Sequence, residues 1–211
     1  MGDIEEHRSF KLCLVGLWLN FAATEHSAVR WSCGVYSLSM TVLFTVSALY
    51  HRPNWSPEKR MMMRRVDHAA IYGLISGTYT PLCMLLDEAT GSKLLRLVWS
   101  GAVAGMIHSM FSRGTLGSKG LSVAIYITLG WIVVPYSRDF AQVLPLTSIF
   151  LLWGGGIFYS VGALMYACHW PDPSPTIFGY HEVFHCAVIV AAAFHFGGIV
   201  IALESKNLLA F

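Results

Sequence analysis

The chain has 211 residues, of which 55% are hydrophobic and only 12% are charged. An ordinary soluble domain carries about 25% charged residues, because it must cover its surface with them. The composition therefore argues against soluble globular, disordered, collagen-like, coiled-coil and disulfide-scaffold proteins, and it favours a lipid bilayer as the solvent. The formal net charge of +2 gives no reason to expect a nucleic-acid partner.

A membrane-spanning helix needs about 20 largely apolar residues. The hydrophobic segments predict seven such helices, at about 10–26, 33–51, 67–86, 94–111, 120–136, 143–168 and 180–203. The first is the weakest, because it contains Lys11, Asn20 and Glu25. No connecting segment is long enough for a further domain. We therefore expect residues 1–211 to form one all-α integral membrane domain, a seven-transmembrane helix bundle.

The distribution of Lys and Arg predicts the orientation of this bundle, since cytoplasmic loops are enriched in both. Nine of them fall on the side of the N-terminus and five on the other side. This bias predicts a cytoplasmic N-terminus and, after seven spans, an external C-terminus. We see no cleavable signal peptide and expect a multi-pass protein of the plasma membrane.

Two groups of small residues carry packing predictions. Gly154, Gly155 and Gly156 interrupt the sixth predicted span, which favours close approach of a neighbouring helix. The five cysteines lie in or beside apolar segments with no metal-like spacing, and we interpret them as reduced packing residues. They are Cys13, Cys33, Cys83, Cys168 and Cys186.

Polar residues converge at one depth of the predicted bundle. Ser47 and His51 end the second span, Asp67 opens the third, and His181 and His185 begin the seventh. Residues four apart share one helix face. The predicted topology puts all three helix ends on the cytoplasmic side, so the five side chains occupy one layer.

Zinc fits this layer. Three neutral imidazoles and a water form an open tetrahedral zinc site, and bound zinc lowers the pKa of water to about 7. His51, His181 and His185 would be the ligands. Asp67 would act as general base or orient a ligand, and Ser47 would hydrogen-bond the water or a substrate carbonyl.

Other interpretations of these residues remain open. The histidines could be interfacial packing residues, with Asp67 as a helix cap. His68 should point away from Asp67, and His108 or His169 could replace a ligand. The string from His181 to His185 also has the H-E-x-x-H form of zinc metalloproteases, which makes Glu182 a second candidate base.

At these positions the sequence resembles the hemolysin III family, the bacterial branch of the progestin and adiponectin receptor superfamily. Four strings carry the resemblance: SALYH (47–51), RVDHAAIY (65–72), GTYTP (77–81) and PSPTIFGYHEVFH (173–185). They occur in family order, and the similarity covers about residues 31–200. The resemblance implies seven helices, a cytoplasmic N-terminus and a zinc site with His51, His181 and His185 as ligands. It also implies that Asp67 and Ser47 lie at or beside the zinc water, and related members hydrolyse the amide of ceramide.

Three functions follow as alternatives. The first is a zinc-dependent hydrolase of a membrane lipid amide. The second is a non-catalytic, receptor-like or lipid-homeostasis protein with structural zinc. The third is a cytolytic pore, which should carry polar residues along whole helix faces, whereas this chain concentrates them at one end.

Overall fold

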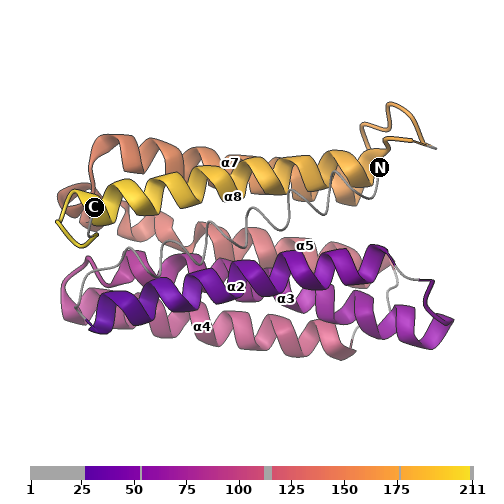
Figure 1. Ribbon diagram of the computed structural model, residues 1–211, viewed down its shortest axis with the longest axis horizontal. Coiled ribbons are helices and arrows are strands. Elements are labelled where there is room, and N and C mark those ends of the chain that lie inside the picture. The colour runs from indigo at the N-terminus through magenta and orange to yellow at the C-terminus, as the bar shows by residue number, and fades with distance from the viewer. Residues whose placement is uncertain (1–26, 53, 112–115, 176, 210–211) are drawn as a thin grey trace. The chain divides into compact units, whose positions relative to one another are not determined.

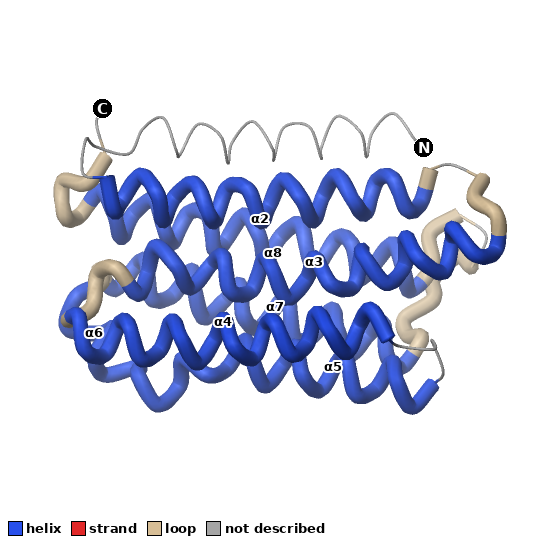
Figure 2. The backbone as a smooth tube through the Cα atoms, turned by 90° about the horizontal axis from the view of Figure 1, so that it is seen from below, coloured by secondary structure: helices blue, strands red, loops and turns tan. Residues whose placement is uncertain are grey.

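The computed structural model of the protein describes residues 27–52, 54–111, 116–175 and 177–209 (Figure 1). All regular elements in these residues are helical (Figure 2), apart from an isolated β-bridge between Ser174 and Phe178. The first predicted span, 10–26, lies outside the described residues. The chain divides into two compact units, Met1–Arg113 with Asn207–Phe211, and Gly114–Lys206. Each unit is described below by itself.

Unit 1 contains α2 (Ser27–His51), α3 (Pro57–Cys83) and α4 (Glu88–Phe111). The start of α3 follows from its sequence, because Ser56 is the N-cap, its Oγ accepting the Lys59 N–H at 3.5 Å, and proline occupies the first turn. The start of α4 has a similar cap. Asp87 Oδ1 accepts the Thr90 N–H at 3.0 Å, which lowers the pKa of the Asp87 carboxyl.

The helix α3 is the inner helix of unit 1, since it packs against both α2 and α4. Two glycines permit this contact. A Cβ at Gly77 would collide with Ser39 of α2, and a Cβ at Gly105 of α4 would collide with the Tyr72 ring of α3. The Trp99 indole of α4 also donates to Thr80 Oγ1 of α3 at 3.2 Å. Glycine therefore sets the spacing on both sides of α3.

Unit 2 contains α5 (Leu116–Gly130), the 3-10 helix η1 (Trp131–Tyr136), α6 (Ser137–Val143), α7 (Leu146–Cys168) and α8 (Tyr180–Glu204). The helices α7 and α8 lie side by side along most of their length (Figure 1). A Cβ at Gly154 or Gly155 would collide with the Phe194 or His195 ring of α8. The predicted close packing at this glycine run is confirmed for these two glycines.

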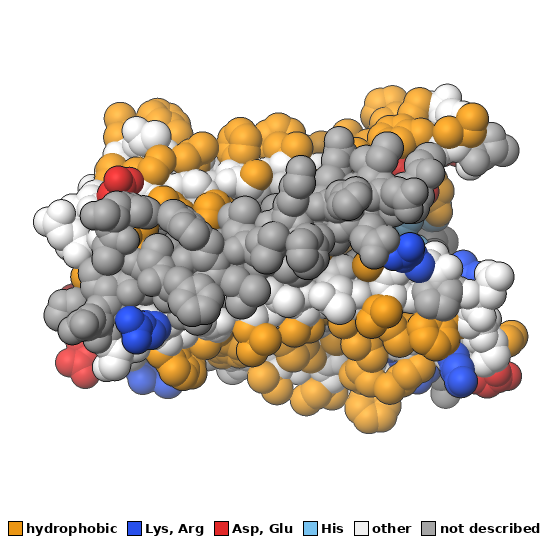
Figure 3. Space-filling view, in the orientation of Figure 1, with side chains coloured by type: hydrophobic (Ala, Val, Ile, Leu, Met, Phe, Trp, Pro, Cys, Tyr) orange, Lys and Arg blue, Asp and Glu red, His pale blue; other side chains and the backbone are white. Residues whose placement is uncertain are grey.

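Five helical segments of the described chain are long and apolar enough to cross a membrane, so this is a multi-pass integral membrane protein. They are α2, α4, Gly120–Val143, α7 and α8. In the space-filling view, hydrophobic side chains continue along the flank of α4, whereas charged side chains gather toward the helix ends (Figure 3). Trp31, Phe111 and Phe150 are among the exposed apolar side chains, as expected of surfaces that face lipid.

The predicted span 67–86 does not meet the same criterion, although α3 is 27 residues long. Its interior position explains this difference. The side chains of Asp67, Ser76, Thr78 and Thr80 are buried within the protein and so do not meet lipid. The hydroxyls of Ser76 and Thr78 donate hydrogen bonds to the carbonyls of Tyr72 and Leu74 in the same helix. The seven predicted spans are thus supported in part.

Two other expectations need correction. The predicted spans 33–51 and 67–86 leave residues 52–66 as a loop, whereas Lys59, Arg60, Arg64 and Arg65 belong to the first turns of α3. Of the four cysteines that the described residues contain, Cys33 and Cys83 are buried, but Cys168 and Cys186 are exposed. The last two therefore do not pack inside the chain, because they lie on helix faces directed outward.

Candidate metal centre

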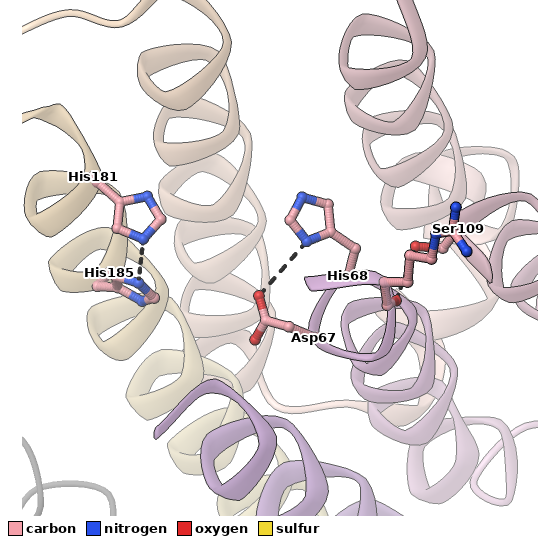
Figure 4. A network of polar contacts seen from close by, with 6 residues as sticks. Asp67, His68, Ser109, His181 and His185 are labelled. Atoms are coloured by element: carbon pink, nitrogen blue, oxygen red, sulfur yellow. Dashed lines mark hydrogen bonds and ion pairs between the residues drawn. The ribbon is translucent and has the colours of Figure 1, made fainter. Parts of the chain in front are cut away.

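The first two turns of α8 bring His181 and His185 together. Their Nε2 atoms lie 3.1 Å apart and face each other, as Figure 4 shows. The two rings are nearly perpendicular, at 87°, with centroids 4.6 Å apart. Helical geometry explains this arrangement, because residues four apart lie on one face, one turn from each other.

This distance suits a metal ion. Two imidazole nitrogens bound at about 2.0–2.1 Å to a tetrahedral zinc lie about 3.3 Å apart. The separation of 3.1 Å therefore needs only a small adjustment of the two rings. The same pair can share a hydrogen bond if one ring carries its proton on Nε2. His181 and His185 could thus hold a metal ion without any movement of α8.

Aromatic side chains of unit 2 lie around the His181 ring. The His181 ring lies 5.6 Å from Tyr166 of α7 and 6.3 Å from Phe184, measured between centroids. The Tyr180 ring lies 6.4 Å from the His181 ring and 6.2 Å from that of Tyr166, between centroids. These rings restrict the rotamers of His181 and keep it near His185. Sequence reasoning did not assign Tyr166 to the site, since its helix meets α8 only in the tertiary structure.

Two carboxylates define where α8 begins. Glu182 Oε2 accepts the Gly179 N–H at 2.9 Å, and Asp172 Oδ1 accepts the Tyr180 N–H at 3.0 Å. Both carboxylates satisfy N–H groups that the first helical turn leaves without a partner. Because they hold the first turn in place, they also position His181. This capping role favours a structural function for Glu182 over the alternative of a general base.

Substitution of Glu182 tests this role. The variant Glu182→Gln should keep both stability and metal content, because a glutamine oxygen can accept the same N–H. Glu182→Ala should lower stability by about 0.3–1.5 kcal/mol, since it removes the cap. Thermal unfolding and metal analysis of the purified variants would check both results. A loss of activity in Glu182→Gln with the metal retained would instead assign the carboxylate a chemical role.

In unit 1, the last turns of α2 carry Ser47 and His51. Both residues lie in one continuous helix, as their spacing predicts. His51 is exposed, and its ring lies 4.4 Å from that of Tyr50. Ser47, one turn earlier, is half-buried. This helix end therefore presents an imidazole that a metal could reach.

Asp67 lies in the third turn of α3 and is only 9% exposed. It cannot cap this helix, because α3 begins ten residues earlier at Pro57. Its Oδ2 lies 3.6 Å from Nδ1 of His68 (Figure 4). The expectation that His68 points away from Asp67 is thus wrong: its ring turns back along the helix surface toward the carboxylate.

The remaining described histidines have other surroundings. The His169 ring, at the C-cap of α7, packs edge-on against Tyr180 at 4.6 Å. His195 pairs its Nε2 with the Leu152 carbonyl at 3.0 Å and fills the space that Gly155 leaves. His195 therefore packs between α7 and α8. His108 lies in the last turn of α4 and is not part of a group of three possible metal ligands among the described residues.

Comparison with known proteins identifies this class of multi-pass helical protein. A family model described as Haemolysin-III related matches residues 8–196, and the chain therefore belongs to this family. Hemolysin-3 of Bacillus cereus is 35% identical over 133 residues, which cover 63% of this chain and 59% of that protein. The Hemolysin-3 homolog of Bacillus subtilis (strain 168) is 34% identical over 179 residues, or 82% of this chain and 78% of that protein. The chain thus aligns with less than two thirds of the Bacillus cereus protein, and the resemblance inferred from the four motifs is confirmed.

Proposed function

We propose that the protein is a zinc-dependent hydrolase that cleaves the amide of a membrane lipid at the cytoplasmic face of the plasma membrane. The observation that carries this proposal is the pair of facing imidazoles at the start of α8, with Nε2 atoms 3.1 Å apart. The pair lies at the end of an apolar helix, where a lipid headgroup meets water. A soluble substrate would not need a site at this depth.

We propose His51 as the third ligand of the metal. His51 ends α2 in unit 1, whereas His181 and His185 begin α8 in unit 2. The predicted topology puts both helix ends on the cytoplasmic side, which supports a shared site. The three side chains are also a chemically consistent set, since neutral imidazoles are typical zinc ligands.

Zinc bound by three imidazoles would lower the pKa of a water to about 7 and polarise a carbonyl oxygen. Asp67 would accept the proton of the attacking water on its carboxylate and then deliver it to the leaving amine. His68, whose Nδ1 lies 3.6 Å from Oδ2, would orient that carboxylate. Ser47 would donate its hydroxyl to the carbonyl oxygen of the substrate. The carbon–oxygen bond forms first, and the carbon–nitrogen bond breaks once the leaving nitrogen has received the proton, which yields a fatty acid and an amine.

The experiment is a turnover assay of the purified protein in detergent or vesicles, with ceramide and other long-chain lipid amides as substrates. Turnover should disappear with a chelator and return with added zinc. Asp67→Asn should keep the metal and lower kcat by about 10²–10⁴-fold, the usual contribution of a general base. The asparagine side chain has nearly the same size and shape as that of aspartate. The variant should therefore fold, and a loss of turnover can be assigned to the missing carboxylate.

The non-catalytic alternative predicts a different result when metal content and turnover are measured on the same samples. A metal that is present without turnover of any lipid amide would favour a receptor-like or lipid-homeostasis protein with structural zinc. A pore would instead release ions from protein-containing liposomes, without dependence on Asp67. These outcomes would each contradict the hydrolase proposal.

A further inference from the structure

The first turns of α3 extend beyond the part of the helix that a membrane can cover. At 1.5 Å per residue, the 27 residues from Pro57 to Cys83 measure about 40 Å, against a hydrocarbon core of about 30 Å. The excess of about seven residues falls at the charged end, since Glu58, Lys59, Arg60, Arg64 and Arg65 all lie within the first nine positions of α3. In a bilayer of this thickness, residues 57–64, hereafter the basic start of α3, would lie at the level of the lipid headgroups.

Positive charge dominates this segment. Lys59, Arg60 and Arg64 oppose a single acidic residue, Glu58, and the side chains of Lys59 and Arg60 are exposed. Arg60 and Arg64 share a helix face one turn apart, an arrangement that destabilises a helix through repulsion of like charges. An anionic group bound between them would turn this repulsion into attraction. The segment thus has the charge of an anion-binding surface.

Apolar side chains accompany the cations on the same turns. Met61 and Met62 are 39% and 48% exposed. Just before the helix, the Trp55 indole donates to the Leu49 carbonyl of α2 at 3.0 Å, which ties the connection between the two helices. Exposed apolar side chains beside Lys and Arg are a feature of helices that lie at the boundary between headgroups and acyl chains. Charge alone would suit a soluble anion, but this combination suits a lipid.

We propose that the basic start of α3 binds the headgroups of anionic phospholipids in the leaflet that it faces. Lys59, Arg60 and Arg64 contact the phosphates, and Met61 and Met62 insert beside the upper part of the acyl chains. Clusters of four or more Lys and Arg next to a membrane helix attract anionic lipids, and Arg65 completes such a cluster here.

The test measures lipid retention by the full-length protein with native mass spectrometry in detergent. The probes are dioleoyl phosphatidylglycerol and dioleoyl phosphatidylcholine, which differ only in the headgroup. The protein should retain the anionic lipid in preference. The double variant Lys59→Gln/Arg60→Gln should bind phosphatidylglycerol about 25-fold more weakly at low salt, which corresponds to roughly fivefold for each cation removed. The zwitterionic lipid should be unaffected.

The chain offers a matched control. Lys93 and Arg96 of α4 are also exposed, and Lys93→Gln/Arg96→Gln removes the same two charges from unit 1. This variant should keep the preference for phosphatidylglycerol, as should the charge-conserving Lys59→Arg/Arg60→Lys. An equal loss in both neutralised variants would overturn the proposal, because net charge would then explain the binding. Displacement of the lipid by millimolar inorganic phosphate would also overturn it, since the surface would then recognise the anion alone.

Discussion

Replacement of His181 by alanine should abolish zinc binding, reducing the metal content of the purified protein from about one ion per chain to none. The facing arrangement of His181 and His185 is the basis of this expectation, since each supplies one of two nitrogens 3.1 Å apart. With one imidazole removed, at most two ligands remain, which is too few for a closed or catalytic zinc site. We expect a loss of affinity of more than about 100-fold, beyond that caused by the loss of an outer-shell partner.

Metal content by mass spectrometry, for the wild-type protein and each variant, measures this effect. His185→Ala should behave like His181→Ala. The matched control is His169→Asn, which alters another histidine beside Tyr180 and should retain the metal. Asparagine is the appropriate replacement there, because His169 has a φ of 54° that asparagine tolerates. If the wild-type protein binds no metal even after incubation with zinc, the histidines serve packing and the hydrolase proposal fails.

Replacement of Gly155 by alanine should destabilise unit 2. A Cβ at this position would overlap the His195 ring, which is held in place by its contact with the Leu152 carbonyl. Overpacking of a close contact costs about 1–3 kcal/mol. Alanine also favours a helix over glycine by about 1 kcal/mol, which offsets part of this loss. The net result should still be destabilising, because neither α7 nor the ring can move without losing other contacts.

The neighbouring Gly156 provides the control. A Cβ there would meet only Trp131, at an ordinary distance of 3.9 Å. Gly156→Ala should therefore leave stability unchanged or raise it through helix propensity. Unfolding in a denaturing detergent would compare the two variants. The double variant Gly155→Ala/His195→Ala should lose less unfolding free energy than the two single variants together. The reason is that no imidazole ring is left for the new Cβ to overlap. Additive effects would contradict the proposed contact.

The residue pattern was enough to predict the pairing of the two histidines in unit 2. His181 and His185 are four residues apart in an apolar segment, and an apolar segment of this length becomes a helix in a membrane. Their proximity is then a local property of one helix. The same reasoning predicted the close packing at Gly154 and Gly155, because glycine in a membrane helix usually marks a near neighbour.

Contacts that depend on side-chain direction or on a second helix could not be predicted in this way. The turn of His68 toward Asp67 depends on rotamers, which the spacing of residues does not determine. Tyr166 reaches His181 only because α7 packs against α8. The capping role of Glu182 likewise needed the conformation of the chain around Gly179.

The sequence by itself determined the solvent, the family and the helix that carries the histidine pair, because hydrophobicity and local spacing act within one segment. Only the tertiary structure decided the environment of α3. The low hydrophobicity of α3 and its buried Asp67 are consistent with a membrane protein because this helix packs against both α2 and α4. A polar side chain is tolerated there because neighbouring helices, not lipid, surround it, and which helices those are depends on contacts between distant parts of the chain.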